Sequence, residues 1–194
     1  MPDIARITIR DSRDDDIEAI TAIYAHHVLF GTASFETEPP SADVMRRRRA
    51  DVLAKGFPHL VAASAGPVAA LAGAVASPAG EILGYAYAGT YRPRAAYRDT
   101  VENSIYIRHD QIGLGIGARL LPALIARCEA LGLRQMIAVV GDSANSASIR
   151  LHERCGFALI GTLRSVGYKH GRWLDSVFLQ RSLADGDASP PSRA

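Results

Sequence analysis

The run Gly113-Leu114-Gly115-Ile116-Gly117 constrains the fold of this chain more than any other segment. It joins residues 102–108, whose pattern is typical of a strand, to residues 115–131, a helical pattern that ends at Gly132. Small residues at such a junction let amide N–H groups and the helix N-terminus face an anion, commonly a phosphate. The segment therefore predicts a strand–turn–helix unit that can hold a phosphate.

The patterns on both sides of this unit complete the fold prediction. A helix begins in the acidic segment 11–16 and runs to about Leu29, and further helices are predicted over 42–55 and 145–155. Strands are predicted over 4–10, 60–64, 82–89, 136–140, 157–164 and 173–183. This order implies an α/β protein with a mixed sheet. Since no repeat or linker is visible, we expect one domain over 1–183 and a disordered tail over 184–194.

Composition excludes several classes of protein. The chain has 194 residues, 48% hydrophobic and 22% charged, which excludes collagen-like, disordered and coiled-coil proteins. Lys and Arg number 22 against 20 Asp and Glu, so the net charge of +2 requires no nucleic-acid or membrane partner. Cys128 and Cys155 form no metal or redox spacing, and the six histidines are scattered. We therefore expect no metal and a reducing, cytoplasmic location.

One apolar stretch needs separate treatment, because residues 60–80 carry no charge over 21 positions. The stretch is mostly Ala and is interrupted by Gly66-Pro67 and Ser77-Pro78, whereas a membrane helix of about 20 residues favours large apolar side chains. We interpret it as two short core strands around a turn-rich hairpin. The first residues also lack the apolar run of a signal peptide.

The glycine run alone does not identify a ligand. No Gly-Lys-Ser or Gly-Lys-Thr follows it, so it is not a P-loop. Its G-x-G-x-G spacing, late in the chain, also differs from the G-x-G-x-x-G of dinucleotide-binding folds. A tight turn without any ligand is therefore the competing interpretation of this segment taken by itself.

A wider set of segments resembles a known superfamily. The runs SIYIRHDQIGLGIGARLL, MIAVVG and NSASIRLHERCGF resemble the GNAT superfamily of acetyl-CoA-dependent N-acetyltransferases. ETEPP at 36–40, RAAYRDTVENSIYI at 94–107 and LRSVGYKHGRWLD at 163–175 resemble its phosphinothricin and methionine sulfoximine acetyltransferase group. The resemblance covers about 7–183. It implies a GNAT-type mixed, mostly antiparallel sheet flanked by helices, acetyl-CoA as co-substrate, and a homodimer.

In such enzymes the strand before the glycine run pairs with the pantetheine arm of the cofactor, and the run holds its pyrophosphate. The resemblance assigns the first role to Ile105, Tyr106 and Ile107, and a further cofactor contact to Asn145. The pyrophosphate role falls on Gly113, Leu114, Gly115, Ile116, Gly117 and Ala118. Ile112 departs from the family, which usually has Gln or Arg there; Gln111 lies one place earlier.

Glu102 matches the family's general base. An amine with a pKa of about 8 to 10 is mostly protonated near pH 7, so a carboxylate that accepts its proton promotes attack on the thioester. Strand alternation puts Glu102, Ser104 and Tyr106 on one face. The resemblance gives the N–H of Ile107 as the donor to the thioester carbonyl. It places His152 where many members have a Tyr that protonates the leaving thiolate; packing against the cofactor is the competing role.

The acceptor site is implied by two loops and a turn. The resemblance brings the turn over 168–173 toward the site, often across a dimer, and assigns substrate binding to Phe35, Thr37, Glu38, Arg92, Arg94, Tyr97 and Tyr106. Paired guanidiniums at 92 and 94 suit an amino acid with a second anionic or polar group. Solvated surface arginines are the competing interpretation. Glu36 and Asp99 replace an Arg and an aromatic residue of some phosphinothricin enzymes, which leaves open whether phosphinothricin itself is an acceptor.

The sequence thus predicts an N-acetyltransferase that moves acetyl from acetyl-CoA to the α-amino group of a small amino-acid analogue. Methionine sulfoximine, methionine sulfone and phosphinothricin are the candidate acceptors. Attack is direct, with Glu102 as base, and no acyl-enzyme is expected. A GNAT enzyme acting on a polyamine or a protein N-terminus is one alternative, and a non-catalytic CoA-binding module is another.

Overall fold

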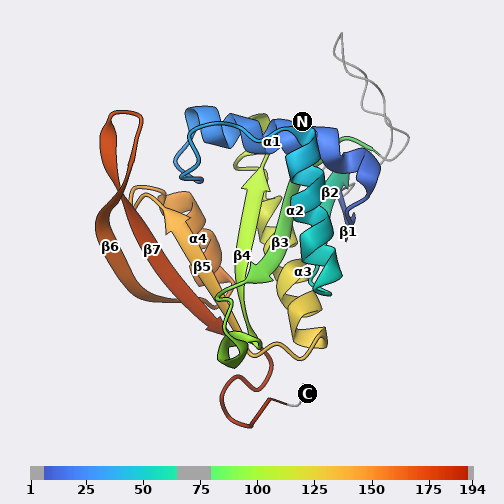
Figure 1. The fold of residues 1–194 in the computed structure, drawn as a ribbon, viewed down its shortest axis with the longest axis vertical. Coiled ribbons are helices and arrows are strands. Elements are labelled where there is room, and N and C mark those ends of the chain that lie inside the picture. The colour runs from blue at the N-terminus through green and yellow to red at the C-terminus, as the bar shows by residue number, and fades with distance from the viewer. Residues whose placement is uncertain (1–6, 65–79, 192–194) are drawn as a thin grey trace.

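A seven-stranded sheet forms the centre of the computed structural model, which describes residues 7–64 and 80–191 (Figure 1). The strands are β1 (Ile7–Asp11), β2 (His59–Ser64), β3 (Ile82–Thr90), β4 (Thr100–Ile107), β5 (Gln135–Gly141), β6 (Ala158–Lys169) and β7 (Arg172–Ser182). The helices are α1 (Ile17–Phe30), α2 (Ala42–Ala54), α3 (Gly117–Ala130) and α4 (Ser146–Arg154), with 3-10 turns η2 (Asp14–Asp16), η3 (Ala95–Tyr97) and η4 (His109–Gln111). Strands and helices follow one another in the predicted order.

The differences from the prediction lie at the ends of elements. Helix α3 begins at Gly117 rather than at 115, because Gly115 has a φ of +74° and is left-handed. Strands β6 and β7 together run from 158 to 182 with a tight turn, and two register shifts in β6 interrupt the alternation on which the shorter prediction rests. Residues 4–6 of the first predicted strand and 65–79 of the predicted hairpin lie outside the described residues.

The sheet is mixed and mostly antiparallel, as expected from the GNAT resemblance. Its strands lie in the order β1-β2-β3-β4-β5-β7-β6. β4 and β5 form the parallel pair, and the other neighbours are antiparallel. The β4–β5 pairing covers only Thr100 to Asn103 against Gln135 to Ala138. Beyond these residues the two strands separate, which places a gap in the middle of the sheet.

Two apolar cores cover the two faces of the sheet. Helices α1 and α2 pack on one face, where Val61, Ala63 and Tyr85 are buried. Helix α3 packs on the other face against residues that include Leu60 and Ala62. Because successive strand residues point to opposite faces, the predominantly apolar stretch of β2 supplies both cores.

The last described residues, after β7, contact the segment just before β5. β6 is an edge strand, and most of its side chains are exposed. In the segment that follows β7, the carbonyls of Ser189 and Pro190 accept hydrogen bonds from Arg134 Nη2 at 2.7 and 3.0 Å.

The division into one domain and a disordered tail stays a prediction. No helix within 7–64 or 80–191 is both long and apolar enough to cross a membrane.

Candidate active site

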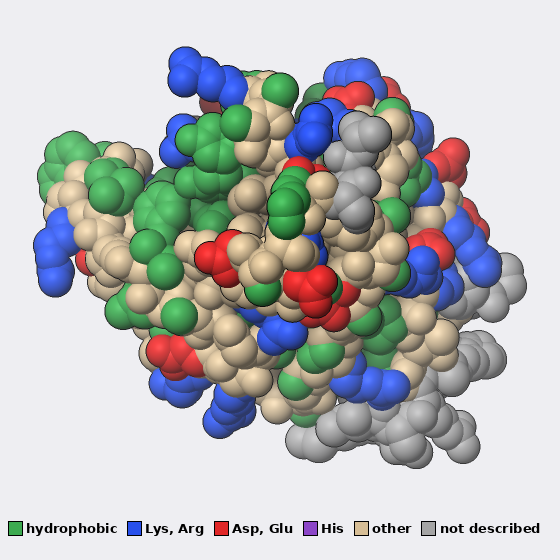
Figure 2. Space-filling model, turned by 90° about the horizontal axis from the view of Figure 1, so that it is seen from below, with side chains coloured by type: hydrophobic (Ala, Val, Ile, Leu, Met, Phe, Trp, Pro, Cys, Tyr) green, Lys and Arg blue, Asp and Glu red, His purple; other side chains and the backbone are tan. Residues whose placement is uncertain are grey.

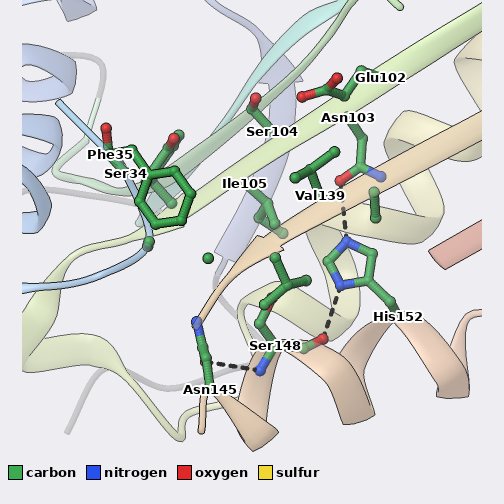
Figure 3. A pocket seen from close by; sticks show the side chains of 15 residues that line it. Ser34, Phe35, Glu102, Asn103, Ser104, Ile105, Val139, Asn145, Ser148 and His152 are labelled. Carbon is green, nitrogen blue, oxygen red and sulfur yellow. Dashed lines mark hydrogen bonds between the residues drawn. The ribbon is translucent and has the colours of Figure 1, made fainter. Parts of the chain in front are cut away.

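A pocket opens where β4 and β5 separate (Figure 3). Its volume is about 220 Å³, and segments from four parts of the chain surround it. The lining residues are 33–35 of the loop after α1, 102–106 of β4, 138–141 of β5, and Asn145, Ser148 and His152 at α4. Side chains and strand backbone therefore face the same cavity.

The backbone of β4 turns polar groups toward this gap. The N–H of Arg108 donates to the carbonyl of Leu83 at 2.9 Å, and Gly84 lies opposite Ile107 in the ladder. Hydrogen-bonded and non-hydrogen-bonded pairs alternate in an antiparallel ladder. The N–H and C=O groups of Ile105 and Ile107 therefore point away from β3, into the gap that β5 leaves.

Glu102 lies at one end of the pocket, and in Figure 3 its side chain projects from β4 on the same side as that of Ser104. Burial raises the pKa of the Glu102 carboxyl, and the positive charge of Arg92 lowers it in part. A carboxylate with a raised pKa is a stronger proton acceptor. The position and the pKa shift both fit a general base.

His152 is buried on α4, and each of its ring nitrogens lies close to an oxygen atom; the neutral ring donates its one N–H to one of the two. Nδ1 lies 2.8 Å from the carbonyl of Ser148, and Nε2 lies 3.1 Å from Oδ1 of Asn103 (Figure 3). The Asn103 amide donates to the Ile137 carbonyl at 3.2 Å, which fixes its oxygen toward the ring. Burial lowers the pKa of His152. His152 thus couples α4 to β4 at the pocket wall, and a role in protonating a leaving thiolate stays a prediction.

The glycine run forms the turn into α3 outside the lining of the pocket. Gly113 and Gly115 have φ values of +84° and +74°, which favour glycine. A Cβ on Gly117 would lie 3.0 Å from the side chain of Leu151, so this glycine lets α3 pack closely on α4. Ile112 is 60% exposed beside the run. The amides before and at the start of α3 are suited to an anion.

Asn145 begins α4 and lines the pocket. Its Oδ1 accepts a hydrogen bond from the N–H of Ser148 at 3.2 Å, which caps the helix. Asn145, which is predicted to contact the cofactor, is therefore also the residue that caps α4.

The loop over 31–40 forms one wall of the pocket through Ser34 and Phe35. A Cβ on Gly141 would lie 2.3 Å from the carbonyl oxygen of Thr32, so the loop rests directly on the end of β5. The ring of Phe35 lies over Gly167, where a Cβ would come within 3.3 Å of it. Glycine at both positions lets the loop approach the sheet.

Glu36 turns away from the pocket toward the helices. Its Oε1 accepts hydrogen bonds from the Tyr24 hydroxyl at 3.0 Å and from Arg48 Nη1 at 2.8 Å. Neither Glu36 nor Asp99 is among the lining residues. The predicted substrate residues Thr37 and Glu38 also lie outside the lining.

The turn between β6 and β7 holds the 31–40 loop from the other side. The ammonium group of Lys169, only 5% exposed, donates to the carbonyl of Ser34 at 2.7 Å. His170 Nε2 lies 3.1 Å from the carbonyl of Gly31. Arg172 forms an ion pair with Asp142 just after β5. The turn therefore contacts the 31–40 loop of the same chain, and its approach to the acceptor stays a prediction.

The predicted arginine pair is not brought together in the pocket. The guanidinium of Arg92 stacks on Tyr91 at 5.2 Å, and its charge acts on Glu102. Arg94 is exposed, and Tyr97 is 42% exposed with its ring 5.7 Å from that of Tyr91. This segment therefore lies near the pocket entrance at Glu102 and outside its lining.

Nine residues that line the pocket were not predicted as site residues from the sequence: Ala33, Ser34, Asn103, Ser104, Ala138, Val139, Val140, Gly141 and Ser148. Ser34, Asn103 and Ser148 are the ones among them whose hydrogen bonds shape the pocket wall. Ser34 precedes the recognised ETEPP segment, and Asn103 follows Glu102 directly. A buried Asn inside a strand next to a candidate base is a signal for a hydrogen-bonded partner. Ser148 acts through its backbone, since its N–H bonds Asn145 and its carbonyl meets His152, and no sequence pattern marks such a role.

Among the described residues, no group of three or more His, Cys, Asp or Glu side chains is placed to hold a metal ion. Cys128 and Cys155 are free, and burial raises the pKa of the Cys128 thiol to about 12. Such a thiol is a poor nucleophile at neutral pH.

Comparisons with known proteins agree with this architecture. The profile of the Acetyltransferase (GNAT) family matches residues 29–157. The phosphinothricin N-acetyltransferase of Alcaligenes faecalis is 54% identical over 184 residues, which cover 95% of this chain and 86% of that protein. The L-methionine sulfoximine/L-methionine sulfone acetyltransferase of Pseudomonas aeruginosa is 41% identical, covering 94% of this chain and 98% of that protein.

A solved structure shows the same fold. The crystal structure of a GNAT superfamily phosphinothricin acetyltransferase from Sinorhizobium meliloti, in complex with acetyl-CoA, superimposes with a TM-score of 0.87. It is 42% identical in sequence and covers 97% of this chain and 95% of that one. The chain therefore belongs to the GNAT acetyltransferase family and is an acetyl-CoA-dependent N-acetyltransferase.

Proposed function

We propose that this enzyme transfers acetyl from acetyl-CoA to the α-amino group of an amino-acid analogue of the methionine sulfoximine, methionine sulfone or phosphinothricin type. The observation that carries the proposal is the pocket between β4 and β5, where the Glu102 carboxylate and the open backbone of β4 face one cavity. The two curated relatives above are named for these same acceptors.

In this proposal Glu102 is the general base. It takes a proton from the acceptor ammonium or from an intervening water, and the amine nitrogen then attacks the thioester carbon. The new C–N bond first gives a tetrahedral oxyanion. As it collapses, the C–S bond breaks, the nitrogen loses its second proton to the departing thiolate, and CoA leaves as the thiol. The raised pKa of Glu102 supports this role, since proton transfer is most efficient when the pKa lies near the working pH.

The donor to the developing oxyanion is better placed at Ile105 than at Ile107. Both backbone N–H groups point into the gap, but Ile105 lines the pocket and Ile107 does not. With about 3.3 Å per strand residue, Ile105 lies about 10 Å along β4 from Glu102, whereas Ile107 lies about 16 Å away. We assign the Ile105 N–H to the thioester carbonyl and the Ile107 N–H to the pantetheine arm, with the diphosphate at the glycine run.

The polar groups near the pocket suit an acceptor that carries oxygen atoms. Arg92 and the buried Lys169 supply positive charge on two sides, and Ser34 and Ser104 supply hydroxyl groups. A polyamine would gain little from this environment. Because Glu36 is paired with Arg48 outside the lining, Arg48 offsets much of the repulsion between its carboxylate and a phosphinate in the pocket. Phosphinothricin therefore belongs among the proposed acceptors.

We also propose that the enzyme is a homodimer formed through the face of β6 and β7. Several large apolar side chains there are more than half exposed: Leu159, Ile160, Leu163, Val166, Tyr168 and Trp173. In Figure 2 hydrophobic side chains gather on the side of the molecule that carries these strands. A contiguous apolar surface on an edge strand is typical of a protein–protein interface.

The direct test is CoA release from acetyl-CoA with a panel of acceptors. The panel contains methionine sulfoximine, methionine sulfone, phosphinothricin, ordinary amino acids, spermidine and an N-terminal peptide. We expect saturable turnover on at least one of the first three. Activity confined to spermidine or the peptide would keep the enzyme class and overturn the acceptor. Binding of CoA without turnover on any amine would support a non-catalytic module.

A further inference from the structure

The end of α1 contacts the end of β4 through an imidazole that the reaction chemistry does not use. His27 Nε2 lies 2.8 Å from the carbonyl oxygen of Ile107. A carbonyl oxygen can only accept, so Nε2 carries the hydrogen and donates it. Burial lowers the pKa of His27, so the ring is neutral at pH 7 and its tautomer is set by this bond.

The ring of His27 is held in place by its neighbours. It packs against the ring of Tyr106 at a centroid distance of 5.5 Å. On another side, a Cβ on Gly31 would lie 3.1 Å from the His27 carbonyl oxygen and 3.7 Å from Nδ1, so glycine at this position leaves room for the imidazole. The direction of the donated hydrogen bond is therefore fixed by packing.

The Ile107 carbonyl that accepts this bond belongs to the cofactor side of β4. The N–H and C=O of one strand residue point to the same side, and those of Ile107 face the gap rather than β3. β5 separates from β4 beyond Asn103 and cannot pair with them. β3 holds the other side of the same peptide unit, through the bond from the Arg108 N–H to the Leu83 carbonyl. The donor from α1 therefore satisfies the gap-facing side at the end of β4, which no strand pairs.

We propose that His27 is a positioning residue for acetyl-CoA: its bond to the Ile107 carbonyl anchors the gap-facing side of the end of β4 to α1, where the Ile107 N–H meets the pantetheine arm. The inference rests on the proposed path of the cofactor along β4. It assigns His27 no part in proton transfer. Without the bond, the end of β4 keeps its N–H donor and its pairing with β3 but loses its anchor to α1, so the cost falls on cofactor binding.

The test compares two variants and two ligands by calorimetry and steady-state kinetics. In His27→Leu, which removes the donor, we expect the Kd of CoA and the KM of acetyl-CoA to rise about fivefold to tenfold, the range for one lost hydrogen bond. The kcat and the acceptor KM stay within about twofold. His27→Gln keeps an N–H donor and restores most of the affinity.

A second ligand shows whether His27→Leu affects only the contact with the pantetheine arm or the whole cofactor site. The probe is 3′-phospho-ADP, the nucleotide part of CoA without the pantetheine arm, and its Kd should be the same in wild type and in His27→Leu. His26→Leu is the matched control, because His26 stacks on His109 at 3.9 Å and this contact does not involve the β4 backbone. It should bind CoA as wild type does.

Three results would overturn the inference. These are equal weakening of CoA and 3′-phospho-ADP, a loss of CoA affinity that His27→Gln does not restore, and unchanged CoA affinity in His27→Leu. Failure of the proposed function is a separate result, because it would be seen in the wild-type enzyme as no acetyl transfer or no CoA binding.

Discussion

At the scale of single residues, the environment of Glu102 determines what its carboxyl group can do. The side chain is half-buried in the pocket wall, and desolvation outweighs the stabilising charge of Arg92, so its pKa is raised. The same burial that makes Glu102 a better base makes its ionised form costly to the fold. Activity and stability should therefore respond in opposite directions when the charge is removed.

Replacing Glu102 by Gln should lower kcat/KM by about 10²-fold or more near pH 7, because the amide cannot accept the amine proton. In the wild type, activity should fall as the pH drops through the raised pKa of Glu102, and the variant should lack this acidic limb. The measurement is a pH–rate profile for both enzymes. Glu153→Gln, an exposed substitution on α4, serves as control. An unchanged profile in Glu102→Gln would remove the assignment.

The same substitution should raise the melting temperature at pH 7. A carboxyl whose pKa is higher in the folded than in the unfolded state stabilises the fold below its unfolded pKa, and this contribution is lost as the pH rises through the folded pKa. Gln mimics the neutral form at every pH. Thermal unfolding should therefore show Glu102→Gln above wild type at pH 7 and a smaller difference near pH 4. A lower melting temperature at pH 7 would contradict the assigned burial.

At the scale of elements, the pocket depends on how the 31–40 loop lies against the ends of β5 and β6. Because Gly141 has no side chain, the backbone of Thr32 can pack directly on it, and the ring of Phe35 packs on Gly167 in the same way. The turn after β6 adds the bond from Lys169 to Ser34. The loop is thus held by backbone contacts that leave its inner side chains facing the cavity.

Gly141→Ala should displace this loop, because the added Cβ would lie 2.3 Å from the Thr32 carbonyl oxygen. We expect the acceptor KM to rise or kcat to fall so that kcat/KM for the acceptor drops about tenfold to a hundredfold. Gly161→Ala is the matched control, since a Cβ there meets nothing within 4 Å. Steady-state kinetics of both variants check the prediction, and equal behaviour of the two would contradict it.

Much of the fold follows from the sequence, because strand alternation and helix ends are local properties. Gly132 and Gly156 end their helices in left-handed conformations, as their positions indicate. The register shifts that lengthen β6 arise from pairing with β7, which no local pattern specifies.

Of the predicted site residues, Glu102, Asn145 and Phe35 line the pocket, whereas Arg94, Thr37 and Glu38 do not. The roles assigned to these residues stay predictions. Residues of a loop are hard to assign to a pocket from the sequence, because the direction of their side chains depends on where the loop backbone is anchored. The anchors of the 31–40 loop are the distant residues Gly141 and Lys169.

At the scale of the whole molecule, the exposed apolar face of β6 and β7 is the surface through which we propose that two copies of the chain associate. Ile160 and Leu163 are 61% and 52% exposed on the edge strand. A charge on both should leave the fold intact and disrupt a dimer formed through this face. We expect wild type to sediment as a dimer and Ile160→Lys/Leu163→Lys as a monomer. Leu53→Lys, on exposed helix α2, should stay dimeric. A monomeric wild type would contradict the proposal.

The measurement that tests the central claim most directly is the position of the transferred acetyl group. Methionine sulfoximine offers an α-amine and a sulfoximine nitrogen, and acetyl-CoA labelled with ¹³C at the carbonyl lets carbon NMR distinguish the two products. The pocket with Glu102 as base predicts an amide at the α-nitrogen, formed by wild type and about 10²-fold more slowly by Glu102→Gln. Acetylation at the sulfoximine nitrogen, or no product from any amino-acid analogue, would contradict the account.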